Sequence, residues 1–130
     1  MIKMSKRRPD RPTERELDIL NILWTRGPST NRDVHEALAE TAKVRQTTTL
    51  NMLQIMIEKG WVVRDDRVRP QIYRANITRQ KTQRAFFDYL KDVLFEGSPK
   101  GLITLFLSKA SKDEVKKLER WLSEQKKSKD

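Results

Sequence analysis

A chain of 130 residues, 36% hydrophobic and 35% charged, has room for one small domain or for one such domain with an appendage. Its formal net charge of +10 favours a polyanionic partner, with nucleic acid as the first expectation and a basic protein without such a partner as the alternative. The chain contains no cysteine, which excludes disulfides and thiolate metal sites, and no apolar run reaches the length of a membrane span.

Residues 1–12 predict a disordered basic arm. They contain five basic residues, two prolines and only three apolar residues. Such an arm either enters a minor groove or serves as a soluble tail, and the composition leaves both alternatives open. The segment lacks the apolar core of a signal peptide, so we expect a cytoplasmic protein without membrane insertion.

Three helices are expected between residues 13 and 60. Thr13 and Glu16 fit a capping box that opens the first helix, and Thr30 caps the second. Gly60 ends the third helix at a position that favours a left-handed cap. The stripes expected to be buried are Leu17, Leu20, Leu23 and Trp24 in the first helix, Val34, Ala37 and Leu38 in the second, and Leu50, Leu53 and Ile57 in the third.

A short hairpin is expected directly after the third helix. Val62 and Val63 form its first strand and residues 71–74 its second, with the polar, turn-like residues 64–70 between them. Three helices followed by a hairpin predict a mainly α fold, with a winged helix-turn-helix DNA-binding domain over residues 13–76.

The outer side of the third helix carries small polar side chains. Thr48 and Asn51 lie opposite the predicted apolar stripe when each residue turns the helix by about 100°. Hydroxyl and amide groups can bond to base edges and touch thymine methyl groups, although an ordinary solvated helix has the same pattern. The candidate DNA-binding residues are Thr30 and Arg32 of the second helix, Arg45, Gln46, Thr47, Thr48, Asn51 and Lys59 of the third, and Arg67 and Arg69 of the wing.

Residues 77–130 predict a helical dimerisation region. Large apolar residues recur at helical spacing, residues 96–99 interrupt the first helix, and Ser111 with Glu114 forms a capping box for the last. Either a second copy related by a two-fold axis covers these apolar faces, or they fold back on the first domain. The expected interface residues are Phe86, Leu90, Val93, Leu94, Leu102, Leu105, Phe106, Leu118, Trp121 and Leu122.

Catalysis is the weakest interpretation of this sequence. The chain has one histidine, no cysteine and no glycine-rich phosphate loop, so we expect no enzyme activity, no cofactor and no metal site. His35, beside Glu36, fits a surface or half-buried histidine better than a metal ligand. An RNA-binding module would expose aromatic residues on a sheet, whereas these aromatics fall on buried stripes. A winged-helix module for protein–protein contacts, without sequence-specific DNA binding, is the alternative function.

A series of motifs carries a resemblance to a known family. They are Glu14-x-x-Leu17 through Leu23-Trp24, Val34-His35-Glu36-Ala37-Leu38, Thr47-Thr48, Glu58-Lys59-Gly60, and the tail segments Leu94 to Pro99 and Leu102 to Phe106. With these motifs in this order and at this spacing, the chain resembles the BlaI/MecI family of penicillinase and methicillin-resistance repressors. The resemblance covers nearly everything except the first dozen residues.

The resemblance implies a homodimeric transcriptional repressor that binds a palindromic DNA operator and regulates antibiotic resistance. On the family pattern, paired threonines read bases. That role passes to Thr47 and Thr48, with Asn51 one turn further along the helix.

The chain departs from the family pattern at several positions. The family often has a basic residue where Ile55 stands, and a glycine in the wing turn where Asp65-Asp66 would repel phosphate. A copper-responsive branch binds metal through a C-terminal cysteine cluster, which this chain lacks. In the antibiotic-responsive branch, a membrane-bound sensor protease cuts between an asparagine and a phenylalanine. The matching pair here is Leu105-Phe106, which leaves relief of repression by a sensor protease open.

Overall fold

The computed structural model describes residues 11–129, so the predicted basic arm lies outside the described residues except for its last two. The chain forms two compact units, of which the first ends at Phe86 and the second begins at Phe87. The first unit extends past residue 76 partly because Trp24 donates a hydrogen bond of 2.9 Å from Nε1 to the backbone carbonyl of Ile77.

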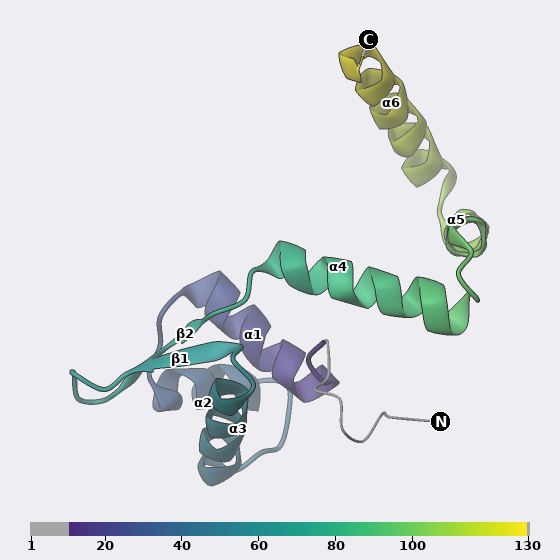
Figure 1. Ribbon diagram of the computed structural model, residues 1–130. Helices are drawn as coiled ribbons and strands as arrows, with labels where there is room; N and C mark the ends of the chain where they lie inside the picture. The colour runs from purple at the N-terminus through teal and green to yellow at the C-terminus, as the bar shows by residue number, and fades with distance from the viewer. Residues whose placement is uncertain (1–10, 130) are drawn as a thin grey trace. The chain divides into compact units, whose positions relative to one another are not determined.

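Three helices and a two-stranded hairpin make up most of the first unit (Figure 1). Thr13 and Glu16 form the predicted capping box, and Thr30 forms a second one with Asp33. The element order confirms the predicted winged helix-turn-helix. The elements are α1 (Glu14–Arg26), α2 (Asn31–Ala39), α3 (Gln46–Glu58), β1 (Val62–Asp65) and β2 (Ile72–Ala75).

One apolar cluster forms the core of the first unit, and each of these helices and strands contributes to it. Leu20 and Leu23 are buried as predicted, whereas Leu17 and Trp24 are half-buried, and Ile19 is buried beside Leu20. The buried members of the cluster are Ile19, Leu20 and Leu23 of α1, Val34 and Leu38 of α2, Leu53 and Met56 of α3, Val62 of β1 and Tyr73 of β2.

The buried side of α3 differs from the predicted stripe. Thr49, Leu53 and Met56 are fully buried, whereas Leu50 is 42% exposed. The half-buried His35 of α2 makes a hydrogen bond of 3.0 Å from Nδ1 to Thr49 Oγ1. The Thr49 hydroxyl also donates to the Arg45 carbonyl at 3.5 Å, so it has partners in the inner position, and Leu50 lies outward.

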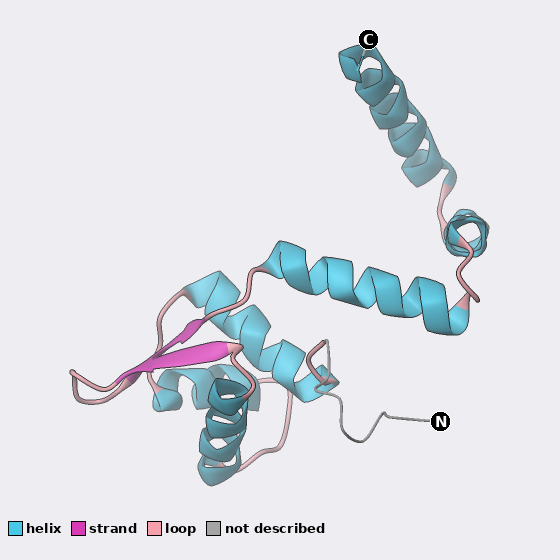
Figure 2. Ribbon diagram, in the orientation of Figure 1, coloured by secondary structure: helices cyan, strands magenta, loops and turns pink. Residues whose placement is uncertain are grey.

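The hairpin is bonded to the link between α1 and α2 at one position. β1 and β2 pair antiparallel in a continuous register that starts with Val62 opposite Ala75 (Figure 2). On the edge of β2 that faces away from β1, the Tyr73 carbonyl accepts a hydrogen bond of 3.0 Å from the Ser29 N–H. The Tyr73 N–H donates one of 2.7 Å to the Ser29 carbonyl. The link between α1 and α2 therefore acts as a third strand at one position.

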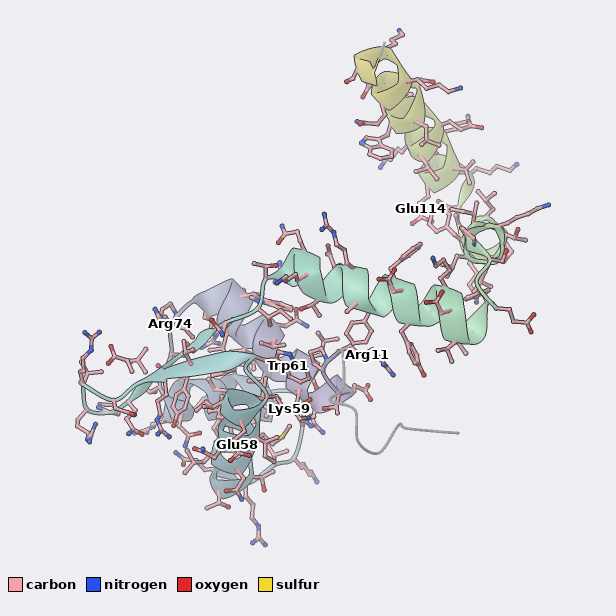
Figure 3. All side chains as sticks on the ribbon, viewed as in Figure 1. Arg11, Glu58, Lys59, Trp61, Arg74 and Glu114 are labelled. Carbon is pink, nitrogen blue, oxygen red and sulfur yellow. The ribbon has the colours of Figure 1, made fainter. Side chains whose placement is uncertain are left out.

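An ion pair joins the start of α1 to the end of α3. Lys59 Nζ lies 2.9 Å from Glu16 Oε2 and 5.1 Å from the centre of the Trp61 ring (Figure 3). Burial by itself would raise the pKa of Glu16, but the hydrogen bonds from Lys59 and Thr13 and the charge of Lys59 outweigh it. The pKa therefore lies below its ordinary value of 4.5.

The second unit is helical, and α4 runs into it from the first. Glu96 and Gly97 have φ angles of 51° and 80° and turn the chain between two of its helices. Gly101 packs closely against Phe95. A Cβ at position 101 would lie 2.8 Å from a carbon of the Phe95 ring, so this contact leaves no room for a larger residue. The elements are α4 (Arg79–Tyr89), the π-helical turn η2 (Leu90–Leu94), α5 (Pro99–Lys109) and α6 (Lys112–Lys129).

The start of α6 is capped as predicted. The Glu114 N–H donates to Ser111 Oγ at 3.1 Å, and the Ser111 N–H donates to Glu114 Oε1 at 2.8 Å (Figure 3). Within residues 11–129, no helix combines the length and the apolar character needed to span a membrane.

The apolar side chains of the second unit find little cover within the chain. None of the ten expected interface residues is buried in the described structure. Val93, Leu94, Leu105, Phe106, Trp121 and Leu122 are exposed, and Phe86, Leu90, Leu102 and Leu118 are half-buried.

We predict that Lys59→Met lowers the free energy of unfolding at pH 7 by roughly 1–3 kcal/mol, because it leaves a buried carboxylate without its main donor. Because the folded-state pKa of Glu16 is depressed, the pair stabilises the fold above about pH 4.5. This contribution is lost as the pH falls through the folded-state pKa. Urea denaturation in a series from pH 7 down to about pH 2 measures both effects.

Arg32→Met is the matched control, because Arg32 pairs with Glu36 at 3.1 Å with both side chains largely exposed. Such a pair contributes little to stability, so this variant should unfold almost like the original chain. A difference between the original chain and Lys59→Met that stays equally large through the whole pH series would show that it does not come from the charged pair.

Candidate nucleic-acid interface

The outer face of α3 presents a mostly polar surface at its N-terminal end. Gln46, Thr47, Thr48 and Asn51 are all exposed, as is Arg45 at the N-cap position. No side chain caps this helix end and no acidic residue lies in its first turn. The partial positive charge of the helix N-terminus is therefore not compensated there and favours a nearby anion.

An open hollow of about 500 Å³ lies between the start of α2, the start of α3 and the wing, and we call it the wing hollow. Thr30 and Arg32 line it from α2, Gln46 and Leu50 from α3, and Arg69 from the wing. All of these residues except Leu50 were predicted to bind DNA. The fold thus brings four predicted DNA-binding residues together from three separate segments of the chain.

The two α2 residues at the wing hollow already have local partners. Thr30 Oγ1 accepts a hydrogen bond of 3.0 Å from the backbone N–H of Asp33. Arg32 forms its exposed ion pair with Glu36. Thr30 therefore shapes the start of α2, whereas the exposed Arg32 can exchange its carboxylate for a phosphate at small cost.

The two acids of the wing turn are each paired with an arginine. Asp65 accepts two hydrogen bonds from the Arg67 guanidinium, at 3.0 and 3.1 Å, and Arg67 lowers the pKa of Asp65 to about 2. Asp66 accepts a hydrogen bond of 2.6 Å from Arg64. The charges of the two acids are thus largely neutralised within the wing. The sequence predicts that Asp65-Asp66 repels phosphate, because it does not show these pairings.

Arg69 differs from the other wing arginines in its partners. Its guanidinium donates to the backbone carbonyls of Asp66 and Val68, at 2.7 and 3.1 Å. No carboxylate within residues 11–129 forms an ion pair with it. Arg69 therefore keeps its full charge, in a fixed position at the wing hollow.

Of the six predicted DNA-binding residues that do not line the wing hollow, Arg67 and Lys59 are held by ion pairs elsewhere. Arg67 lines a separate depression together with Pro28 and Arg74. Lys59, at the other end of α3, holds Glu16. Contacts of either residue with DNA stay predictions, and each contact would compete with an existing ion pair.

Sequence reasoning missed two residues of α3 that belong to this surface. Leu50 was assigned to the buried stripe but lines the wing hollow. Gln54, on the exposed face, accepts a hydrogen bond of 3.2 Å from Arg64 and so links α3 to the wing. No sequence signal identifies either role, because both depend on how the hairpin returns to α3.

A polar helix face with an uncapped N-terminus, set beside a hairpin that carries a cation, defines a winged-helix DNA-binding transcription regulator. The model of the penicillinase repressor family matches residues 12–124, and the chain belongs to this family. This match confirms the resemblance found in the sequence. The family consists of transcriptional repressors rather than enzymes, so the chain is a DNA-binding transcriptional repressor.

Solved structures of similar fold are also transcription regulators. One of them is BlaI of Bacillus licheniformis, solved in solution in its monomeric form in complex with the blaP half-operator. It is 22% identical to this chain, with a TM-score of 0.50. The match covers 56% of this chain and 89% of that chain. A transcriptional regulator of Thermotoga maritima is 20% identical with a TM-score of 0.48, covering 88% and 73% of the two chains. A search of curated proteins found no match. At this identity the likeness to BlaI bears on the fold alone.

We predict that Thr48→Ala and Asn51→Ala each weaken binding to a preferred DNA sequence by roughly 1–3 kcal/mol and binding to random DNA very little. Both side chains are exposed on the outer face of α3, where they can reach base edges. Titration of labelled duplexes, with Thr25→Ala on the exposed side of α1 as the control, gives the two affinities. An equal loss on both DNAs would exclude a role in sequence recognition.

Proposed function

We propose that this repressor works as a homodimer that binds a palindromic operator, with one α3 helix and one wing on each half-site. The observation that carries the proposal is the wing hollow, where Gln46 of α3 and Arg69 of the wing lie together in a chain of the penicillinase repressor family. The solved BlaI complex contains a monomeric form on a half-operator, which supports one copy for each half-site. A repressor of this kind acts where the operator DNA lies, which we take to be the cytoplasm.

In the proposed complex, the face of α3 with Thr47, Thr48 and Asn51 lies in the major groove and contacts base edges. Arg45, beside the start of α3, and Arg69, in the wing, contact phosphates on either side of it. These phosphate contacts set the position of the protein on the DNA, while the base contacts select the sequence. Selection of bound duplexes from a randomised library tests the proposal. A palindromic consensus is the expected result, and no enriched sequence would exclude recognition of a specific operator.

We predict that Arg69→Gln lowers the slope of log affinity against log salt by about one unit, because the variant loses one phosphate contact. The double variant Asp65→Asn with Arg67→Gln is the control. It removes a paired acid and base, so it leaves the net charge of the wing unchanged. Fluorescence titrations over a range of salt concentrations give the slopes.

The double variant should keep the original slope. If it lowered the slope as much as Arg69→Gln, then Arg67 would also contact phosphate, and the distinction drawn between the two arginines would be wrong.

We infer that the second unit joins two copies. Large apolar residues are left exposed on each of η2, α5 and α6, and exposed apolar surface of this extent favours an interaction site. A second copy brings an identical surface, which a two-fold axis can pair with itself. Joining two half-site binders makes the second DNA contact intramolecular and can raise avidity by about 10²–10⁴.

We predict that Phe106→Asp shifts the chain toward monomer and strongly weakens binding to the full palindrome, because it places a charge on an apolar surface of α5. Binding of a single half-site should change little. Thr104→Asp is the control, because residue 104 lies about 200° around the helix from residue 106. Sedimentation and gel-shift assays decide the matter, with circular dichroism as the test of folding. A monomeric variant that binds the full palindrome as tightly as the original chain would exclude dimerisation as the basis of affinity.

Cutting of the chain in this region would act in the same way as Phe106→Asp. The pair Leu105-Phe106, which matches the cut position of the antibiotic-responsive branch, lies inside α5 and is exposed. A protease would have to unwind α5 to reach this peptide bond. We propose that any such cleavage relieves repression by separating the two half-site binders.

A further inference from the structure

Leu50 is out of place in a surface that is otherwise polar. α3 exposes only two large apolar side chains within the described structure, Leu50 at 42% and Ile55 at 45%. A single exposed leucine on an ordinary surface needs no explanation. Leu50, however, lies in the wing hollow together with Gln46 and Arg69, on the surface that faces DNA in the proposed function.

Two parallel rows of side chains run along this part of α3. Gln46 and Leu50 are four residues apart and form one row, and Thr47 and Asn51 form the next. Because the rows lie side by side, a major groove that receives Thr47 and Asn51 also receives Leu50 at its edge. This edge is the one nearest the wing, because Leu50 shares the wing hollow with Arg69.

The chemistry of Leu50 limits what it can recognise in that groove. An aliphatic side chain can neither donate nor accept a hydrogen bond, so it penalises any base edge whose donor or acceptor it covers. The C5 methyl group of thymine is the apolar feature that base edges present in the major groove. Cytosine presents an amino donor and no methyl group.

We propose, on the basis of the proposed function, that Leu50 is a specificity-determining residue that selects thymine by contact with its C5 methyl group. The selected thymine lies at the wing-side edge of each half-site, near the phosphate that Arg69 holds. The polar residues Thr47 and Asn51 recognise the neighbouring bases by hydrogen bonds, so the two rows of α3 use different chemistry.

The test uses duplexes selected by the full-length protein from a randomised library. Each thymine of the selected duplex is replaced in turn by deoxyuridine, which removes only the methyl group. At one position of each half-site, a single replacement should weaken binding about fourfold. This factor corresponds to about 0.8 kcal/mol for one buried methyl-sized group. Leu50→Ala should bind the thymine and deoxyuridine duplexes equally well, whereas Leu50→Met should keep much of the preference.

Ile55→Ala is the matched control, because Ile55 is an equally exposed aliphatic residue on the same helix that does not line the wing hollow. It should leave the response to deoxyuridine at this position unchanged. Thermal unfolding of each variant establishes that the fold is intact.

Two failures are distinguishable. A library that yields no preferred sequence would overturn the proposed function, and the role of Leu50 with it. A preferred sequence in which no thymine methyl group matters, or in which Leu50→Ala responds to deoxyuridine as the original chain does, would overturn the role of Leu50 alone.

Discussion

Two backbone hydrogen bonds between Ser29 and Tyr73 hold the wing against the helical part of the first unit, and the arrangement of the DNA-binding surface depends on them. Tyr73 is almost fully buried in the core, so β2 cannot slide along its neighbours without exposing it. Ser29 directly precedes Thr30, the residue that caps α2. The same pairing that fixes β2 therefore brings the wing beside the start of α2, and the wing hollow follows from it.

In the turn of the wing, residues 65–71, the ion pairs leave Arg69 as a positive charge at one defined place. Arg64 and Arg67 are balanced by the two neighbouring aspartates, and these pairs also hold the turn in shape. Arg69 is held by backbone carbonyls, which fix its position without cancelling its charge. A cation that is already held in place loses little side-chain entropy when it meets a phosphate. In the proposed function, the wing therefore holds a cation in position for one phosphate although it carries two acids.

The two units differ in how far their apolar side chains are buried within the chain. The first closes its core internally, with contributions from α1, α2, α3, β1 and β2 around Tyr73. In the second, large side chains such as Val93, Phe106 and Trp121 are left exposed. In the proposed function, this exposed apolar surface would join two copies, while a separate surface on the first unit contacts bases.

The sequence alone determined the features that depend on neighbouring residues. The capping boxes at Thr13 and Ser111 were predicted correctly, because each joins residues three positions apart. The winged helix-turn-helix and the exposure of Thr48 and Asn51 followed from periodicity, and the motifs identified the family. Only the tertiary structure decided that Leu50 faces outward and that Lys59 is bound. The buried Thr49 bonds to His35, 14 residues away, and Lys59 meets Glu16 across 43 residues. Partners so far apart meet only after the chain has folded, so no local pattern encodes them.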